Sequence, residues 1–234
     1  MRLFLFVFLS LFQLFVAAEQ WERVRLASFP CSGNHWVRNL VEEATGIVTT
    51  SCYPDSEVVV RKMIAPWGGY FEKGGYDGKR RYPESDEPAL LMSHYPMKSS
   101  TFDKKPFTRT IRLVRNPYET LWAHAIASGI YYRAGDIAAF LESETKKWAN
   151  FQLHWNKQND ALTIRFEDLV RDPESSLRMI LDFYGYEATD EDIARAVAKY
   201  PPRGAELRFA GRMPYAQELK VRKRLRPLLR QFGY

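Results

Sequence analysis

The order of apolar and polar residues along the chain predicts strands that alternate with helices. Short apolar runs, typical of buried strands, open the stretch 25–42 and recur at residues 89–93, 108–114 and 162–166. Apolar residues at helical spacing predict a helix after Gly33 and five more, at residues 117–128, 137–158, 174–184, 190–200 and 215–232. This alternation implies an α/β fold with a central parallel sheet and helices on both faces.

The stretch 25–42 carries the first candidate site, because a strand is followed by a tight turn containing Gly33 and then by a helix. The N–H groups of a first helical turn have no partner inside the helix, so phosphate or sulfate oxygens are favoured there. Asn34 and His35 add side-chain donors at the same turn. The two glycines and the Lys-Ser/Thr pair of a Walker A loop are missing, which disfavours an ordinary ATPase or GTPase.

Two further candidates, His94 and Arg115, follow predicted strands. Ligands of parallel sheets bind beyond the carboxyl ends of the strands, so these residues and Gly33 are expected at one edge. A histidine titrates near neutral pH and can act as a general base, although a lone histidine is more often structural. An arginine fork fits a terminal phosphate, and the alternative for Arg115 is an ion pair with Glu119 on the next helical turn.

Four stretches together resemble one known family. Pro30, Ser32, Gly33, His35 and Trp36 fit five of the seven positions of the 5′-phosphosulfate loop of PAPS-dependent sulfotransferases. Three later stretches fit the same family in the same order: Met-Ser-His-Tyr-Pro at 92–96, Ile-Arg-Leu-Val-Arg-Asn-Pro-Tyr at 111–118, and Ile-Arg-Phe-Glu-Asp-Leu at 164–169 followed by Asp-Pro. The resemblance covers about residues 22–234 and looks closest to the branch of the membrane system that modifies glycans or secreted proteins.

The resemblance implies a single P-loop-like domain that moves the sulfuryl group of PAPS to a hydroxyl of a glycan or a secreted molecule. His94 stands where the family has its catalytic histidine, and Pro202-Arg203-Gly204 resembles the family's closing loop. The implied donor-binding residues are Cys31, Ser32, Gly33, Asn34, His35, Trp36, Arg115, Phe166, Arg203 and Gly204. Trp36 matches the adenine-stacking tryptophan and can also pack in the core. No metal is required.

Three departures from the family pattern leave a second function possible besides that of an active enzyme. Cys31 replaces the loop Lys or Arg, Met92 replaces a Lys, and Ala123 replaces a Ser on the 3′-phosphate. Losing one preorganised charge contact can cost on the order of 10²-fold in rate. Other cations are available to substitute: Arg38, Lys98 and Arg112. The alternative to an active enzyme is a catalytically silent module that binds PAP, PAPS or a sulfated glycan, and a P-loop kinase ranks third.

Composition and charge agree with one enzyme-sized domain. The 234 residues are 46% hydrophobic and 26% charged, enough for one full core. A formal charge of +6 suits an anionic donor and an acidic acceptor, and the scattered basic residues show no nucleic-acid motif. The dense basic run 220–226 is expected to be the solvated face of a closing helix. Trp148, Phe151 and Trp155 share one helical face and are expected in the core.

The N-terminal segment indicates entry into the secretory pathway. Residues 3–18 are uncharged but short for a membrane span, which needs about 20 residues. The small residues Val16-Ala17-Ala18 resemble a signal-peptidase site. Residues 1–18 are therefore predicted to be a signal peptide before a domain at 19–234, with the Golgi lumen or the extracellular space as destination. The alternative is an uncleaved type II anchor, the one case in which we expect membrane contact.

Two local features complete the predictions, and the sequence does not indicate an oligomeric state. Cys31 and Cys52 allow at most one bridge, and a free Cys31 at a helix N-terminus is expected to have a lowered pKa. Residues 66–88 hold five glycines and a basic trio, which fits either a functional lid or a surface loop.

Overall fold

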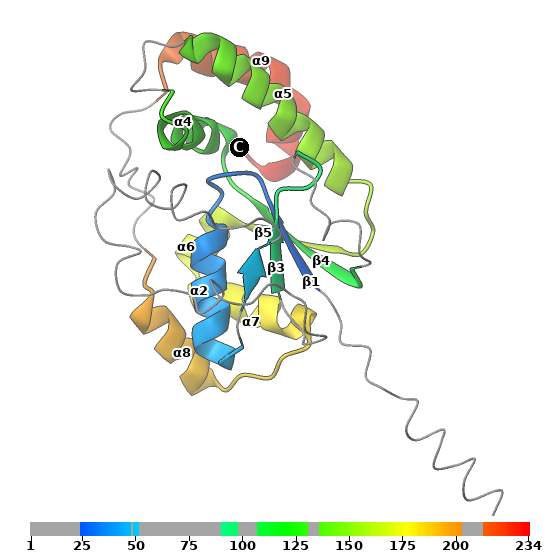
Figure 1. The fold of residues 1–234 in the computed structure, drawn as a ribbon, viewed down its shortest axis with the longest axis vertical. Helices are drawn as coiled ribbons and strands as arrows, with labels where there is room; N and C mark the ends of the chain where they lie inside the picture. The colour runs from blue at the N-terminus through cyan, green and yellow to red at the C-terminus, as the bar shows by residue number, and fades with distance from the viewer. Residues whose placement is uncertain (1–23, 48, 52–89, 98–106, 131–135, 203–212) are drawn as a thin grey trace, which may run out of the picture.

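The fold is an α/β domain with helices on both sides of a parallel sheet (Figure 1). The computed structural model describes residues 24–47, 49–51, 90–97, 107–130, 136–202 and 213–234. Within these residues the sheet has the order β2-β3-β1-β4-β5, and every strand pair is parallel. The strands are β1 (Val24–Ser28), β2 (Thr50–Ser51), β3 (Leu90–Ser93), β4 (Arg109–Val114) and β5 (Ala161–Arg165). The predicted fold class is confirmed.

The helices also follow the sequence pattern closely. They are α2 (Asn34–Thr45), α4 (Pro117–Ala127), α5 (Ile137–Trp155), α6 (Phe166–Arg171), α7 (Pro173–Tyr184), α8 (Asp190–Lys199) and α9 (Tyr215–Phe232). Two short elements were not predicted from the sequence: the two-residue strand β2 and the six-residue helix α6. Neither is long enough to display a hydrophobic period.

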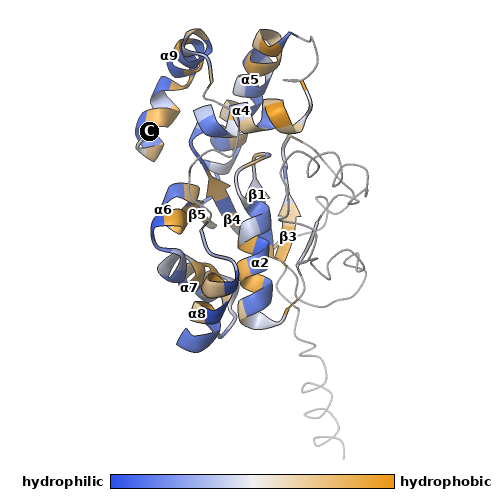
Figure 2. Ribbon diagram, turned by 90° about the vertical axis from the view of Figure 1, so that its left-hand side faces the viewer, coloured by the Kyte–Doolittle hydropathy of each residue, from blue (hydrophilic) through white to orange (hydrophobic). Residues whose placement is uncertain are grey.

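The strands divide the core into two apolar layers. Val24 and Leu26 of β1 point to the layer formed with α2, α7 and α8, while Ala27 points to the layer formed with α4, α5 and α9. This alternation follows from the two-residue period of a strand. Figure 2 shows the same two groups of helices above and below the sheet.

The aromatic stripe of α5 lies in the second layer, as predicted. Trp148 and Phe151 are fully buried and Trp155 is 3% exposed. Phe151 packs edge-on against Phe29, which directly follows β1, with ring centroids 6.3 Å apart. The stripe therefore fixes the chain just before the candidate anion-binding turn.

The parallel register brings the predicted site to one edge of the sheet. Ala27 of β1 is paired with Ser93 of β3 and with Arg112 of β4, so the turns after these three strands emerge together. These turns carry Gly33, His94 and Arg115, as expected. Several predictions concern residues outside the described part: the N-terminal segment 1–18, Cys52, the loop 66–88, Lys98, Arg203 and Gly204. Within the described part, no helix is both long and apolar enough to cross a membrane.

Candidate functional site at the turn after β1

The turn after β1 has the backbone geometry of an anion-binding loop. Cys31 and Gly33 both adopt left-handed conformations, with φ of 63° and 98°. The carbonyl of Gly33 accepts from the N–H groups of Trp36 and Val37, at 3.0 and 3.2 Å, so α2 begins directly after the glycine. The first turn of α2 contains no acidic residue. Its positive end is therefore available to an anion.

Two side chains of this turn are buried with unused hydrogen-bonding capacity. Ser32 is 1% exposed, and its hydroxyl has no hydrogen-bond partner among the described residues. Asn34 is 4% exposed and donates from Nδ2 to the Ser28 hydroxyl at 2.8 Å, whereas its Oδ1 is unpartnered within the same described set. A buried polar atom without a partner costs about 1–3 kcal/mol. Polar groups of a bound ligand would remove that cost.

Phe166 covers the turn from the start of α6. A Cβ atom at Gly33 would lie 2.5 Å from Cδ2 of Phe166, so the ring occupies the space that any larger residue would need. Trp36 meets the same ring edge-on at 5.9 Å between centroids and donates from Nε1 to the carbonyl of Tyr200 at 2.8 Å. Trp36 is 8% exposed and thus has the core role that the sequence allowed. Its adenine-stacking role stays a prediction.

Arg115 joins the end of β4 to the turn. Its Nη1 donates to the carbonyl of Cys31 at 3.1 Å, and its guanidinium carbon lies 4.5 Å from the centroid of the Phe166 ring. Nε and Nη2 both donate to Oε2 of Glu119, at 3.3 and 3.0 Å. The ion pair between Arg115 and Glu119, which the sequence offered as the alternative to phosphate binding, is therefore present. Three of the five guanidinium N–H groups are used in these bonds, and within the described residues the other two form no further hydrogen bond.

His94 lies at the end of β3 with its ring orientation fixed. Nδ1 is 2.7 Å from the backbone carbonyl of Ser28, the last residue of β1. A carbonyl can only accept, so Nδ1 carries the proton and the neutral ring has its lone pair on Nε2. Because the Ser28 hydroxyl accepts from Asn34, Ser28 connects His94 to the donor turn.

His35 is held neutral. Burial, together with the smaller effects of the nearby charges of Arg38 and His94, lowers the pKa of His35 to about 3. At neutral pH this ring can offer hydrogen bonds to an anion but no positive charge.

The predicted lowering of the Cys31 pKa is wrong. Burial raises the pKa of the Cys31 thiol to about 12, and the opposing effect of the Arg115 charge is smaller. The helix N-terminus favours a thiolate, but removal of the sulfur from water disfavours it more strongly. Cys31 is a free cysteine. Because its pKa is raised, it is a neutral thiol at the position of the family's Lys or Arg.

The structure also locates two of the three substitute cations. Arg38 is fully buried and donates from Nε to the Thr49 hydroxyl at 2.8 Å. Arg112 donates to the Thr163 hydroxyl and to Oδ1 of Asn156, at 2.9 and 2.7 Å, and burial lowers its pKa to about 10, so it stays charged at neutral pH. Arg115 bonds directly to the donor turn through the carbonyl of Cys31.

One positioning residue was not recognised from the sequence as part of the site. Glu167 accepts from the backbone N–H of Asn116 at 2.8 Å and from the hydroxyl of Tyr234 at 2.7 Å. Asn116 in turn caps α4 by accepting from the N–H of Tyr118 at 2.9 Å. Tyr234 thus stabilises, through Glu167, the turn that follows Arg115. Glu167 belongs to the quoted motif, but nothing local in the sequence indicates either partner.

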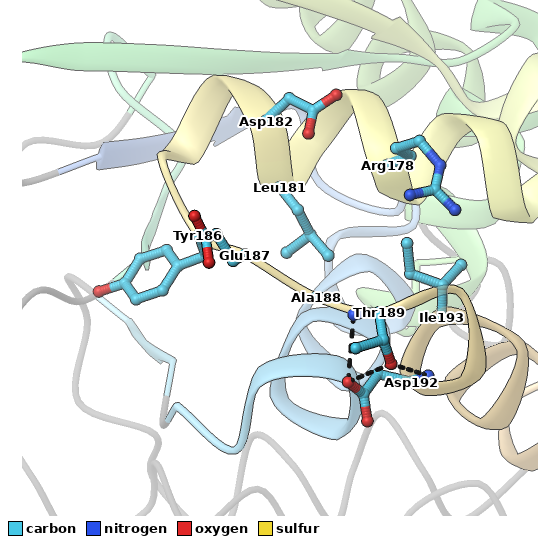
Figure 3. Close-up of a pocket in the computed structure, with 9 residues that line it drawn as sticks. All are labelled: Arg178, Leu181, Asp182, Tyr186, Glu187, Ala188, Thr189, Asp192 and Ile193. Carbon is cyan, nitrogen blue, oxygen red and sulfur yellow. Dashed lines mark hydrogen bonds between the residues drawn. The ribbon is translucent and has the colours of Figure 1, made fainter.

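A separate cavity of about 430 Å³ lies at the junction of α7 and α8 (Figure 3). Thr189 and Asp192, which line it, are bonded to each other in the cap of α8. The cavity contains neither the donor turn nor His94 or Arg115, so we do not regard it as the active site. Among the described residues, no three His, Cys, Asp or Glu side chains gather as metal ligands.

A parallel α/β sheet with an anion-binding turn after its central strand defines a P-loop-like domain. The chain belongs to the sulfotransferase family, because the model of the sulfotransferase domain matches residues 22–200. At family level this assignment supports sulfuryl transfer as the chemistry.

Known proteins agree with this assignment. The chain is 27% identical over 192 residues to a WSCD family member of Aedes aegypti, which covers 76% of this chain and 55% of that protein. It is 26% identical over 183 residues to human sulfotransferase 6B1, covering 72% of this chain and 56% of that protein. The chain thus spans about half the length of these curated relatives.

Solved structures support the fold. The crystal structure of mouse sulfotransferase SULT7A1 complexed with PAP is similar with a TM-score of 0.56 at 20% identity, over 92% of this chain and 89% of that one. Retinol dehydratase in complex with androsterone and the inactive cofactor PAP gives a TM-score of 0.54 at 15% identity, over 88% and 80%.

Proposed function

We propose that this protein transfers the sulfuryl group of PAPS to a hydroxyl group of a glycan or a secreted molecule, with His94 as the general base. The observation that carries the proposal is the bond between Nδ1 of His94 and the carbonyl of Ser28. It leaves Nε2 unprotonated at the same edge of the sheet as the anion-binding turn. A base in that state is what an acceptor hydroxyl requires.

The residues of the turn fit an anionic donor. PAPS supplies the activated sulfuryl group when it is bound. The first-turn N–H groups of α2, the unpartnered hydroxyl of Ser32 and the neutral ring of His35 are suited to the 5′-phosphosulfate end. Arg115, with two N–H groups unused among the described residues, is suited to the 3′-phosphate, and Phe166 supplies an aromatic wall beside it. The PAP in two similar structures is consistent with this donor.

The reaction then needs one proton transfer and one displacement at sulfur. Nε2 of His94 takes the proton of the acceptor hydroxyl as its oxygen forms the new S–O bond, and the bond from sulfur to the donor's phosphate oxygen breaks. Positioning and electrostatic stabilisation dominate such transfers, so a rigid base and a rigid anion site are the main contributions of the protein.

A catalytically silent binding module is the second candidate function. The observation that favours it is the neutral Cys31 thiol, which cannot stabilise charge on the leaving oxygen. Such a module would still bind PAP through the turn and Arg115. We place either form in the secretory pathway, since residues 3–18 have the composition of a signal peptide.

The test combines donor binding with transfer of labelled sulfate from PAPS to panels of glycan and tyrosine-peptide acceptors. We expect His94→Ala to lose transfer by about 10²-fold to 10⁴-fold while PAP binding is kept. His154→Gln, which alters a partly buried histidine on α5, is the matched control and is expected to keep transfer.

Two other outcomes would decide against an active enzyme. PAP binding without transfer in the natural chain, together with transfer gained in Cys31→Lys, would establish the silent module. Absence of PAP binding to a folded chain would reject both functions. Mass spectrometry of the secreted chain tests the predicted N-terminus at Glu19.

A further inference from the structure

Several exposed cations of α9 have no carboxylate partner among the described residues, whereas most exposed cations of α5, α6, α7 and α8 have one. On α6, α7 and α8 the exposed arginines are paired with carboxylates: Arg171 with Asp168, Arg178 with Asp190, and Arg195 with Asp192 and Glu43. On α9, Lys223, Arg226 and Arg230 are exposed and form no ion pair with any residue in the described part of the chain. Arg222 and Arg224 pair with Glu218 and Glu142, whereas the charges of Lys223, Arg226 and Arg230 are not neutralised by a described carboxylate.

Charge is concentrated on α9. The helix contains one carboxylate, Glu218, and six basic residues: Lys220, Arg222, Lys223, Arg224, Arg226 and Arg230. Its net charge of five is close to the +6 of the whole chain. Figure 2 shows α9 along the outer edge of the molecule.

Helical spacing arranges part of this charge in a line. Arg222, Arg226 and Arg230 follow one another at four-residue intervals and span about 12 Å along the helix axis. Tyr215 and Leu219, which are 70% and 43% exposed, continue the same line toward the start of the helix. We call these five residues, with the neighbouring Lys223, the α9 ridge.

The ridge fits a chain of repeated negative charges better than a membrane. Arginine forks bind sulfate and carboxylate groups through paired hydrogen bonds, and a row of them matches a linear polyanion. An amphipathic helix binds a bilayer by inserting its apolar face. In α9 that face, with Val221, Leu225 and Phe232, is buried in the core.

We infer that the α9 ridge is a binding surface for a linear anionic polysaccharide, outside the donor site. The choice of a polysaccharide among polyanions rests on the proposed function, in which a glycan is an acceptor. Tyr215 provides an exposed aromatic face for a sugar ring at one end of the row of arginines.

The helix is also fixed to the elements of the donor site. Val221 and Leu225 of α9 belong to the apolar layer against which Tyr118, three residues after Arg115, packs. Tyr234, two residues beyond the end of α9, bonds Glu167 beside Phe166. A polysaccharide on the ridge is therefore held by the same rigid block that carries Arg115, so that α9 can add affinity for long acceptors.

The test measures binding of a fluorescent heparin-derived octasaccharide to the full-length protein without PAPS. We expect the triple variant Lys223→Gln, Arg226→Gln, Arg230→Gln to bind about 10-fold to 100-fold more weakly, with a shallower dependence of affinity on salt. The matched control, Arg171→Gln, Arg178→Gln, Arg195→Gln, removes the same net charge from α6–α8 and is expected to change affinity less than about threefold. Circular dichroism checks that both variants keep their helices.

Three results would overturn the inference: unchanged affinity in the ridge variant, an equal loss in both variants, or equal or tighter binding of duplex DNA or phosphatidylserine vesicles at the same salt concentration. Failure of the proposed function is detected separately. In that case the octasaccharide binds through the ridge while neither PAP binding nor sulfate transfer is observed.

Discussion

Phe166 lies against Gly33 so closely that position 33 has no room for a side chain. A Cβ atom at position 33 would approach Cδ2 of Phe166 to 2.5 Å, and Gly33 has a φ of 98°, which non-glycine residues rarely adopt. The glycine of the donor turn is therefore required both by the backbone and by the ring from α6.

Gly33→Ala is expected to weaken PAP binding and to lower the free energy of unfolding by about 1–3 kcal/mol, since both the backbone and the ring must move. Calorimetric titration and urea unfolding measure the two effects. Adding Phe166→Leu to Gly33→Ala relieves the clash but not the backbone strain and is expected to recover part of the stability. The same loss in the single and the double variant would show that Phe166 does not constrain the turn.

Glu119→Gln tests whether the Glu119 carboxylate and the 3′-phosphate of the donor compete for Arg115. The carboxylate occupies two N–H groups of Arg115 and adds negative charge beside the candidate 3′-phosphate position. We expect several-fold tighter PAP binding in the variant, because the competing charge is removed while the side chain keeps its shape. Glu142→Gln on the exposed face of α5 is the control. Weaker PAP binding in Glu119→Gln would mean that the carboxylate mainly holds Arg115 in position.

Cys31 is expected to resist alkylation in the folded protein. Burial raises its pKa to about 12, so very little thiolate is present at pH 8. In a Cys52→Ser background, iodoacetamide should react about 10²-fold to 10³-fold more slowly with the folded chain than with the chain in urea. The folded rate should also rise about tenfold per pH unit between pH 8 and 10. Equal rates in the folded and unfolded chains would contradict a buried, neutral thiol.

His35 makes stability depend on pH. Its pKa is about 3 in the folded state, whereas an unfolded histidine titrates near 6.5. Between these values the unfolded chain binds more protons, so the free energy of unfolding falls as the pH is lowered from about 6.5 toward 3. Urea unfolding between pH 7 and 5, before most carboxylates titrate, should show a smaller decrease in the free energy of unfolding for His35→Gln than for the natural chain. Identical losses would argue that the His35 ring is already solvated in the folded state.

The sequence predicted those parts of the site that depend on neighbouring residues. The turn, the start of α2 and the strand ends before His94 and Arg115 follow from local propensities and from the pairing of parallel strands. The limits of α9 were predicted to the residue, since its apolar period is regular and Gly233 ends the helix.

The sequence by itself thus determined the class of fold, the order of the site-bearing turns and the family. Only the tertiary structure decided the chemical state of the groups. The thiol of Cys31 is neutral because folding removes it from water, and the tautomer of His94 depends on a carbonyl 66 residues away. Local patterns encode where the backbone turns, whereas pKa values and hydrogen-bond partners depend on solvent exclusion and on contacts between segments far apart in the chain.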